Sequence, residues 1–175
     1  MHSLGAGALL ALTSALPAFA QSDLNDLQMA HVAVVADGID IRYAHLALAL
    51  SESAAVRLFA ETMIRDHTSI SAAVVALAKK LNVEAQDNPV SRKLLADAAG
   101  ITTRLSKLRG AAFDRTYAAN ELAYHHAVNT LVEGTFIPRI KNAEVKQAFT
   151  GALVVFKEHE QHATMMVHDV TESQR

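Results

Sequence analysis

Two histidines of this 175-residue chain lie in segments whose apolar residues recur every three or four positions. His67 lies between Met63 and Ile70, and His159 lies between apolar residues in a second segment of the same kind. This spacing is typical of the buried face of a helix, so both imidazoles are expected to point into a core. A buried imidazole must be hydrogen-bonded or coordinated, because burying it without a partner is costly.

Carboxylates accompany these histidines at helical spacing. Glu121 and His125 are four residues apart, as are Glu158 and His162, so each pair shares one helix face. Imidazole and carboxylate groups together are ligands for zinc, copper or iron. We therefore consider one transition-metal ion as a cofactor. The candidate ligands are His67, His125, His159, Glu121, Asp40, Asp66 and His162.

The same residues also allow a second interpretation that needs no metal. Buried histidines in helical bundles commonly bond to a carboxylate, a hydroxyl or a backbone carbonyl. Suitable partners in this chain are Asp66, Asp114, Tyr117 and Tyr124. The sequence leaves both interpretations open.

The elements that would position these residues are all predicted to be helices. The chain is 51% hydrophobic with only 7 Gly and 3 Pro, and no segment alternates apolar and polar residues as a strand would. We expect four long helices, with a shorter one between the second and third. The long helices are expected over about 22–51, 54–81, 111–132 and 142 onward, and the short one over about 90–108. Residues 134–141 are expected to connect the last two long helices.

A simple measurement along the helix axes tests whether the candidate ligands can meet. At about 1.5 Å of rise per residue, Asp40 lies about 18 Å and His67 about 21 Å from the turn at Ser51. His125, Glu121 and His159 lie at about 18, 24 and 27 Å if the last two long helices connect at that end. They lie at about 24, 18 and 15 Å if the short helix reverses those two helices. Both arrangements predict one polar layer in the middle of the bundle.

The inward face of the first long helix is predicted from its apolar residues in the same way. We expect it to carry Leu27, Val34, Ile41, Ala44 and Leu48. Asp40 then directly precedes an inward-facing residue.

The first twenty residues resemble a secretory signal peptide. An apolar run from Leu4 to Leu16 precedes Ala18-Phe19-Ala20, a small-x-small cleavage site, so cleavage is expected after Ala20 and one domain over 21–175. The protein is then periplasmic or secreted, without a stable transmembrane anchor; an uncleaved anchor is the alternative. The chain has no cysteine, which excludes disulfides and thiolate ligands.

Charge and motifs exclude several classes of function. The net charge of −2 argues against a nucleic-acid binder. The chain has no glycine-rich phosphate loop, no zinc-protease H-E-x-x-H and no nucleophile beside a base, so a hydrolase is not expected. Other partners and a homo-oligomer are left open.

Several segments together resemble a family of exported bacterial proteins classed as a domain of unknown function. The resemblance rests on Met63 to His67, on Gly110 to Tyr117, on His125 and on His159. It implies an all-α, ferritin-like four-helix bundle with an extra short helix in the connection between the second and third helices, and no established activity. The positions carried over are Asp66, His67, Phe113, Asp114, Tyr117, His125 and His159, with Asp40 where the family usually has Glu.

The resemblance does not extend to iron storage. Ferritins use two Glu-x-x-His pairs for a di-iron centre, whereas the pairs in this chain are spaced by four residues, not three. We therefore expect an exported helical protein, non-enzymatic or weakly redox-active, that binds one ion of iron, zinc or copper. The alternative is a structural or stress-related envelope protein whose buried His, Asp and Tyr residues form a hydrogen-bond network.

Overall fold

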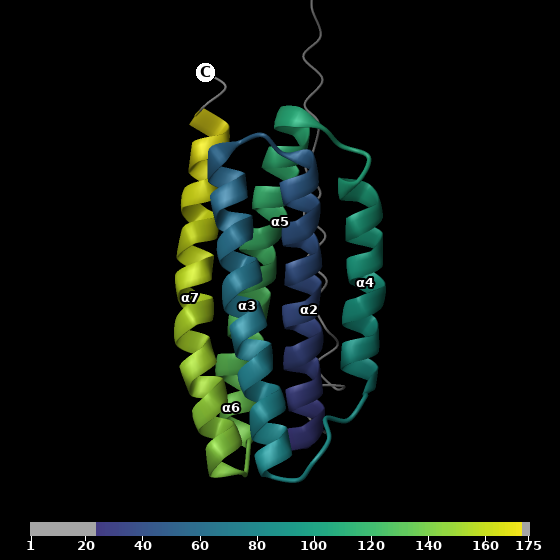
Figure 1. The fold of residues 1–175 in the computed structure, drawn as a ribbon, viewed down its shortest axis with the longest axis vertical. Coiled ribbons are helices and arrows are strands. Elements are labelled where there is room, and N and C mark those ends of the chain that lie inside the picture. Colours follow the sequence, from purple (N-terminus) through teal and green to yellow (C-terminus); the bar gives the residue numbers. More distant parts are fainter. Residues whose placement is uncertain (1–23, 173–175) are drawn as a thin grey trace, which may run out of the picture.

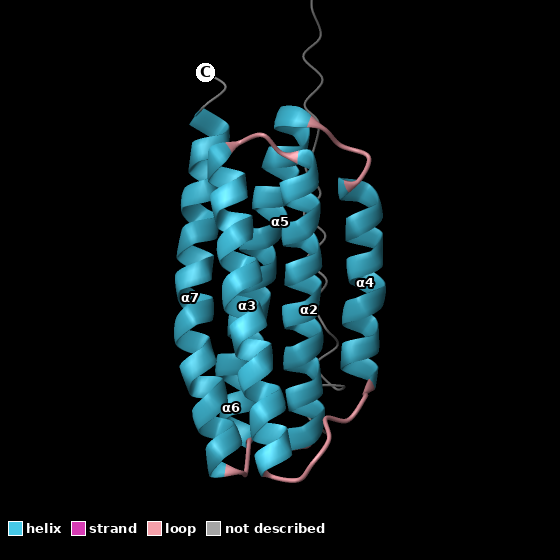
Figure 2. Ribbon diagram, in the orientation of Figure 1, coloured by secondary structure: helices cyan, strands magenta, loops and turns pink. Residues whose placement is uncertain are grey.

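The computed structural model describes residues 24–172. The predicted signal peptide lies outside this range. Every regular element of the described residues is a helix, and no strand occurs among them (Figure 2). The prediction of an all-α protein is therefore confirmed.

Seven helical segments follow one another within residues 24–172, and three of the long ones begin after an asparagine that caps the first turn. They are α2 (Asp26–Leu50), α3 (Ala54–Lys80), α4 (Pro89–Leu105), α5 (Gly110–Leu131), the π-helical segment η1 (Val132–Phe136), α6 (Ile137–Arg139) and α7 (Ala143–Glu172). Asn25 and Asn88 cap α2 and α4 by accepting hydrogen bonds from backbone N–H groups of the first turn. Asn142 does the same for α7. The predicted short helix over 90–108 is α4.

The helices α2, α3, α5 and α7 lie side by side, and α4 packs mainly against α2 (Figure 1). The helix α4 returns the chain to the end of the molecule where α2 meets α3, and α5 starts at that end. At this end the Ser51 hydroxyl donates to Asp114 at 2.5 Å. At the other end Lys80 of α3 pairs with Glu144 of α7. The short helix thus reverses the last two long helices, which is the second of the two arrangements considered above.

The inward face predicted for α2 was wrong. Of its five residues only Ala44 is buried, and the buried face instead carries Asp37, Ile39, Asp40 and Tyr43. The helix α2 contacts α3, α4 and α5, and its own apolar residues are spread over nearly all of its faces. Because no face is clearly polar, the sequence pattern does not show which face points inward.

The connection predicted over residues 134–141 is also mostly helical. The chain continues from α5 through the wider turn of η1 into α6, and only Ile140 to Asn142 separate α6 from α7. Pro138 has no N–H to donate to the preceding turn. Just before it, the N–H of Ile137 donates to the carbonyl of Val132 five residues earlier, so the helix continues through a π-helical turn.

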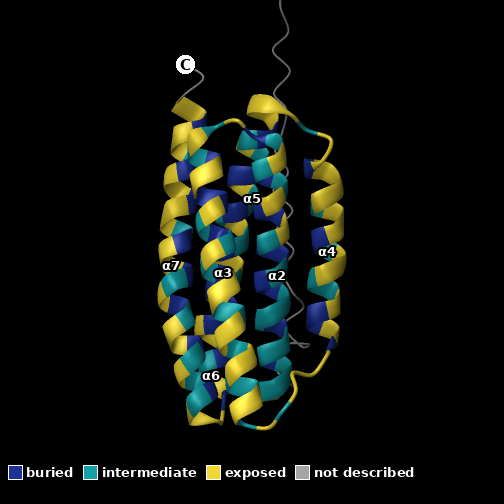
Figure 3. Cartoon of the chain, viewed as in Figure 1, coloured by how far each residue is buried: buried dark blue, intermediate teal, exposed yellow. Residues whose placement is uncertain are grey.

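Two apolar clusters fill the two ends of the bundle. The cluster near the α2–α3 turn includes Tyr43, Phe59, Met63, Phe113, Tyr117 and Met166. The cluster at the opposite end includes Met29, Val32, Phe136, Phe149 and Leu153. Buried residues follow the inner faces of the helices along the bundle (Figure 3). Within residues 24–172 no helix has both the length and the apolar composition to cross a membrane.

Candidate metal centre

A layer of polar side chains separates the two apolar clusters. Four helices supply it: Asp37 and Asp40 come from α2, His67 from α3, Glu121 and His125 from α5, and His159 from α7. All six residues are at most 3% exposed. Asp37 and Asp40, like Glu121 and His125, share a helix face because of their three- or four-residue spacing. The polar layer predicted from helix rise is therefore present in the bundle.

Each of the three buried histidines uses one ring nitrogen outside the centre of the layer. His67 Nδ1 lies 2.8 Å from Asp37 Oδ1, and His159 Nε2 lies 3.0 Å from Asp66 Oδ2. His125 Nδ1 donates to the backbone carbonyl of Glu121 at 2.9 Å. These bonds fix the orientation of the three rings.

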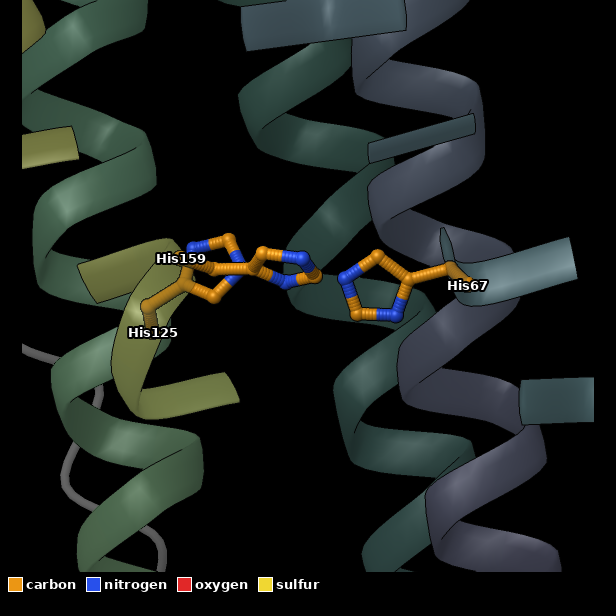
Figure 4. Close-up of side chains that lie close together, drawn as sticks. All are labelled: His67, His125 and His159. Atoms are coloured by element: carbon orange, nitrogen blue, oxygen red, sulfur yellow. The ribbon is translucent and has the colours of Figure 1, made fainter. Parts of the chain in front are cut away.

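The other ring nitrogens form no well-aligned hydrogen bond among the described residues, although Asp40 lies within ion-pair distance of two of them. They are Nε2 of His67, Nε2 of His125 and Nδ1 of His159. The three histidines can each offer one nitrogen such that all three lie within 4.8 Å of one another. In Figure 4 the three rings lie at one level, with His67 reaching in from α3 and the other two from the opposite side. Three imidazole nitrogens this close together in a core are a donor set that could coordinate one ion.

Carboxylates extend this group on the α2 side. Asp40 Oδ2 lies 2.6 Å from His67 Nε2 and 3.3 Å from His125 Nε2. Asp40, Glu121 and His125 form a second group whose potential ligand atoms lie within 4.8 Å of one another. Both oxygens of Asp40 and Oε2 of Glu121 lack a well-aligned hydrogen-bond partner among residues 24–172. The ring nitrogens that face the centre thus have acidic oxygens beside them, and Asp40 lies within ion-pair distance of two of these nitrogens.

Burial and neighbouring charge set the protonation of the layer. Burial opposes a charge on His67, but Asp37 and Asp40 outweigh it and raise the pKa of His67 to about 10. Burial likewise opposes the charge of Asp40, yet His125 and His67 hold its pKa far below the usual range. Burial, followed by the charge of Asp40, raises the pKa of Glu121 well above its usual value. Without a metal, His67 is therefore cationic, Asp40 anionic and Glu121 neutral.

His159 differs from His67. Burial lowers the pKa of His159 to about 4, and the bond to Asp66 opposes this shift only in part. Asp66 is 24% exposed in its side chain and also pairs with Arg65 at 2.8 Å. His159 is therefore neutral near pH 7, as a metal ligand must be.

The structure brings together five of the seven candidate ligands: His67, His125, His159, Glu121 and Asp40. Asp66 lies behind His159 and orients it from outside the group. His162 and Glu158 are exposed on α7, so their four-residue spacing places them on the outer face of that helix. These two positions do not reach the layer.

Sequence reasoning missed Asp37, which orients His67 and also accepts a hydrogen bond from Ser71 at 3.0 Å. Asp37 lies three residues before Asp40, and the middle of this helix contains no other acid. This spacing could have shown that the two carboxylates share one helix face. The incorrect inward face assigned to α2 concealed it.

The fold and this layer define an all-helical bundle protein with a buried histidine and carboxylate centre. The chain belongs to the family described as domain of unknown function DUF4142, which matches residues 11–166. The resemblance to a domain-of-unknown-function family is thereby confirmed. No curated protein and no solved structure matches the chain.

Proposed function

We propose that this protein is an exported, ferritin-like helical bundle that binds one transition-metal ion in its polar layer. The ligands are Nε2 of His67, Nε2 of His125, Nδ1 of His159 and one oxygen of Asp40. Asp37, Asp66 and the Glu121 carbonyl hold the three imidazoles in position. Glu121 keeps its proton and lies beside Asp40.

One observation carries this proposal. Three buried imidazoles each bind an acceptor through one nitrogen and turn the other nitrogen toward a common centre, where the carboxylate of Asp40 lies beside two of them. In metal sites a ligating histidine almost always donates its second nitrogen to a carboxylate or a carbonyl, which fixes ring orientation and tautomer. Here all three histidines have such a partner.

The set of ligand atoms limits the choice of metal. Three imidazole nitrogens and one carboxylate oxygen suit zinc, copper or iron, whereas calcium and magnesium prefer an all-oxygen set. The chain has no cysteine, so soft thiolate coordination is excluded. The departure from Glu-x-x-His spacing argues for one ion and against ferritin-type di-iron chemistry.

The exported and ferritin-like parts of the proposal rest on other features. Export is supported by the apolar run Leu4 to Leu16 and the small-x-small site that ends at Ala20. A ferritin-like bundle is supported by the crossover helix α4, which reverses α5 and α7 relative to a simple up-and-down arrangement.

Metal analysis of the purified full chain tests the central claim. We expect about one equivalent of zinc, copper or iron after incubation and dialysis, and a higher melting temperature with the metal than with a chelator. His125→Ala should lose the metal, whereas His162→Ala, which removes an exposed histidine from the chain, should retain it. Substoichiometric metal in the wild type, or equal retention by both variants, would falsify the proposal.

A metal-free role is the second candidate, and one contact favours it. His67 lies between Asp37 and Asp40 at 2.8 and 2.6 Å, so a protonated imidazole there forms a buried ion pair with two carboxylates. The layer would then hold the four helices in register in a structural envelope protein. In that case His67→Ala lowers stability in the presence of a chelator. Adding metal then leaves the melting temperature of the wild type unchanged.

A further inference from the structure

A cavity of about 850 Å³ lies between α4 and α5, next to α2. It arises because α4 packs mainly along α2 and leaves the facing side of α5 uncovered. Pockets for small organic ligands commonly span about 300–1,000 Å³. The cavity is therefore large enough for a molecule of that class. Metal binding in the polar layer does not explain a cavity of this size.

Apolar side chains form most of the cavity wall. The helix α4 contributes Leu94, Ala98 and Ile101, and α5 contributes Leu122, Ala123 and Val128. The alanines of α5 make room where larger residues would close the gap. A ligand with an apolar body would remove this surface from water, at about 25 cal/mol for each Å² buried.

Among the described residues that line the cavity, the charged side chains other than histidine are acidic: Asp97, Glu160 and Asp37. No lysine or arginine of residues 24–172 lines it. Lys93 pairs with Asp97 at 2.8 Å, and Asn129 donates to Glu160 at 2.6 Å, so these acids have partners of their own. An anionic ligand such as a fatty acid would meet these carboxylates, and the positive charge of His67 in the same wall is already balanced by Asp37 and Asp40.

The inner end of the cavity reaches the polar layer. His67 and His125 both line it, and the Nε2 atom of each lies beside Asp40 without a well-aligned hydrogen bond. Tyr43, which is 1% exposed, lines the same region. A ligand that enters between α4 and α5 thus passes along an apolar wall and ends beside polar groups.

We propose that this cavity binds an uncharged small molecule with an apolar body and one polar end directed toward His67 and His125. This inference goes beyond metal binding and does not depend on it, because the apolar wall and the acids Asp97 and Glu160 are not part of the proposed metal site. If a metal is bound, the polar end of the ligand lies next to it.

The test uses the full chain and 1-N-phenylnaphthylamine, an uncharged fluorescent probe. We expect saturable binding at one probe per chain, with chelator and with zinc. Ala123→Trp and Ile101→Trp, on opposite walls, should each weaken binding at least tenfold by filling the cavity. Ala112→Trp is the matched control, because Ala112 is exposed on α5 and does not line the cavity.

Several outcomes would overturn the inference. Unsaturable probe binding, or equal binding by all three variants, removes the cavity as the site. Tighter binding of the anionic probe 8-anilinonaphthalene-1-sulfonate contradicts the charge argument. If the probe binds only after Leu9→Asp and Leu10→Asp, the occupant of the cavity is the N-terminal segment of the uncleaved chain. If the protein is a dimer that Ala123→Trp dissociates, the occupant is a second copy of the chain. If the wild-type chain binds the probe but binds no metal, the metal proposal is refuted and the cavity proposal is not.

Discussion

On the α2 side of the polar layer, His67 lies between two fully buried carboxylates, whereas on the α7 side His159 faces a single carboxylate that is partly exposed. That carboxylate, Asp66, is also neutralised by Arg65. The two imidazoles are equally buried, at 3% and 1% exposure, yet the pKa of His67 is raised and that of His159 is lowered. Burial alone therefore does not decide the charge of a core histidine. The number and the solvent exposure of its acidic partners decide it.

Because of this difference, the two histidines would play different parts in metal binding. His159 is already neutral and needs no change to coordinate an ion. His67 must first release the proton held by Asp37 and Asp40. In exchange, those carboxylates compensate the positive charge of the ion after it binds. The α7 side of the layer thus offers a neutral imidazole to the ion, and the α2 side offers the carboxylates that balance its charge.

The largest expected effect comes from removing His67. In the presence of a chelator at pH 7, His67→Ala should lower the free energy of unfolding by about 3–5 kcal/mol, because it leaves Asp37 and Asp40 buried without a cation. His159→Ala should cost about 2 kcal/mol, since Asp66 keeps Arg65 and contact with water. Urea unfolding followed by circular dichroism measures both.

The control for this pair is His162→Ala, which should stay within about 0.5 kcal/mol of the wild type because His162 is exposed. Equal losses in His67→Ala and His159→Ala would show that the two sides of the layer do not differ in the way described.

The second prediction concerns the pH dependence of stability without metal. The raised pKa of His67, about 10 against 6.5, gives stability that is complete below pH 6.5 and is lost as the pH rises toward 10. The lowered pKa of His159, about 4, gives stability that is present above pH 6.5 and is lost as the pH falls toward 4. The metal-free protein should therefore be most stable near pH 6.5.

Variants can assign the two limbs of this profile. A shift from 6.5 to about 4 corresponds to about 3 kcal/mol for His159. His159→Phe, which cannot take up a proton, should flatten the acid limb by about that amount and leave the alkaline limb unchanged. An acid limb that is as steep in His159→Phe as in the wild type would assign it to other groups.

Much of the fold could be predicted from the sequence, because local signals determine it. The spacing of apolar residues in α3 and α7 placed His67 and His159 on the buried side, and both are buried. The capping residues Asn88 and Asn142 marked helix starts to within a residue or two. The direction of α5 and α7 could not be predicted, because it depends on how α4 packs, which is a tertiary property.

The polar layer was predictable in its level but not in its details. Helix rise alone placed Asp40, Glu121 and the three histidines at one height, because rise does not depend on packing. The angular position of a residue around α2 does depend on packing, and there the nearly uniform apolar surface misled the assignment and hid Asp37. The exposed position of His162 has a similar cause. The spacing of Glu158 and His162 fixes a shared face without saying which way that face points.

The smallest expected effect is on the protons exchanged when metal binds. Near pH 7.5 the uptake of one zinc ion should release about one proton, from His67, and none from His159, which is already neutral. The apparent affinity should then rise about tenfold for each pH unit between about 6.5 and 8.5, or about 1.4 kcal/mol. Calorimetric titration in buffers of different ionisation enthalpy counts the protons.

A matched pair of variants tells the two sides of the layer apart in this experiment. Asp66→Asn should leave the slope of affinity against pH unchanged, because the histidine that it orients releases no proton. Asp37→Asn should flatten the slope at the alkaline end, because the loss of one carboxylate lowers the pKa of His67 toward that range. Release of two protons per ion in the wild type would instead indicate that Glu121 is also a ligand, since burial and the charge of Asp40 raise its pKa and favour its protonated form before the metal binds. The same slope in all three proteins would remove His67 as the source of the proton, and with it the division of the layer into two unlike sides.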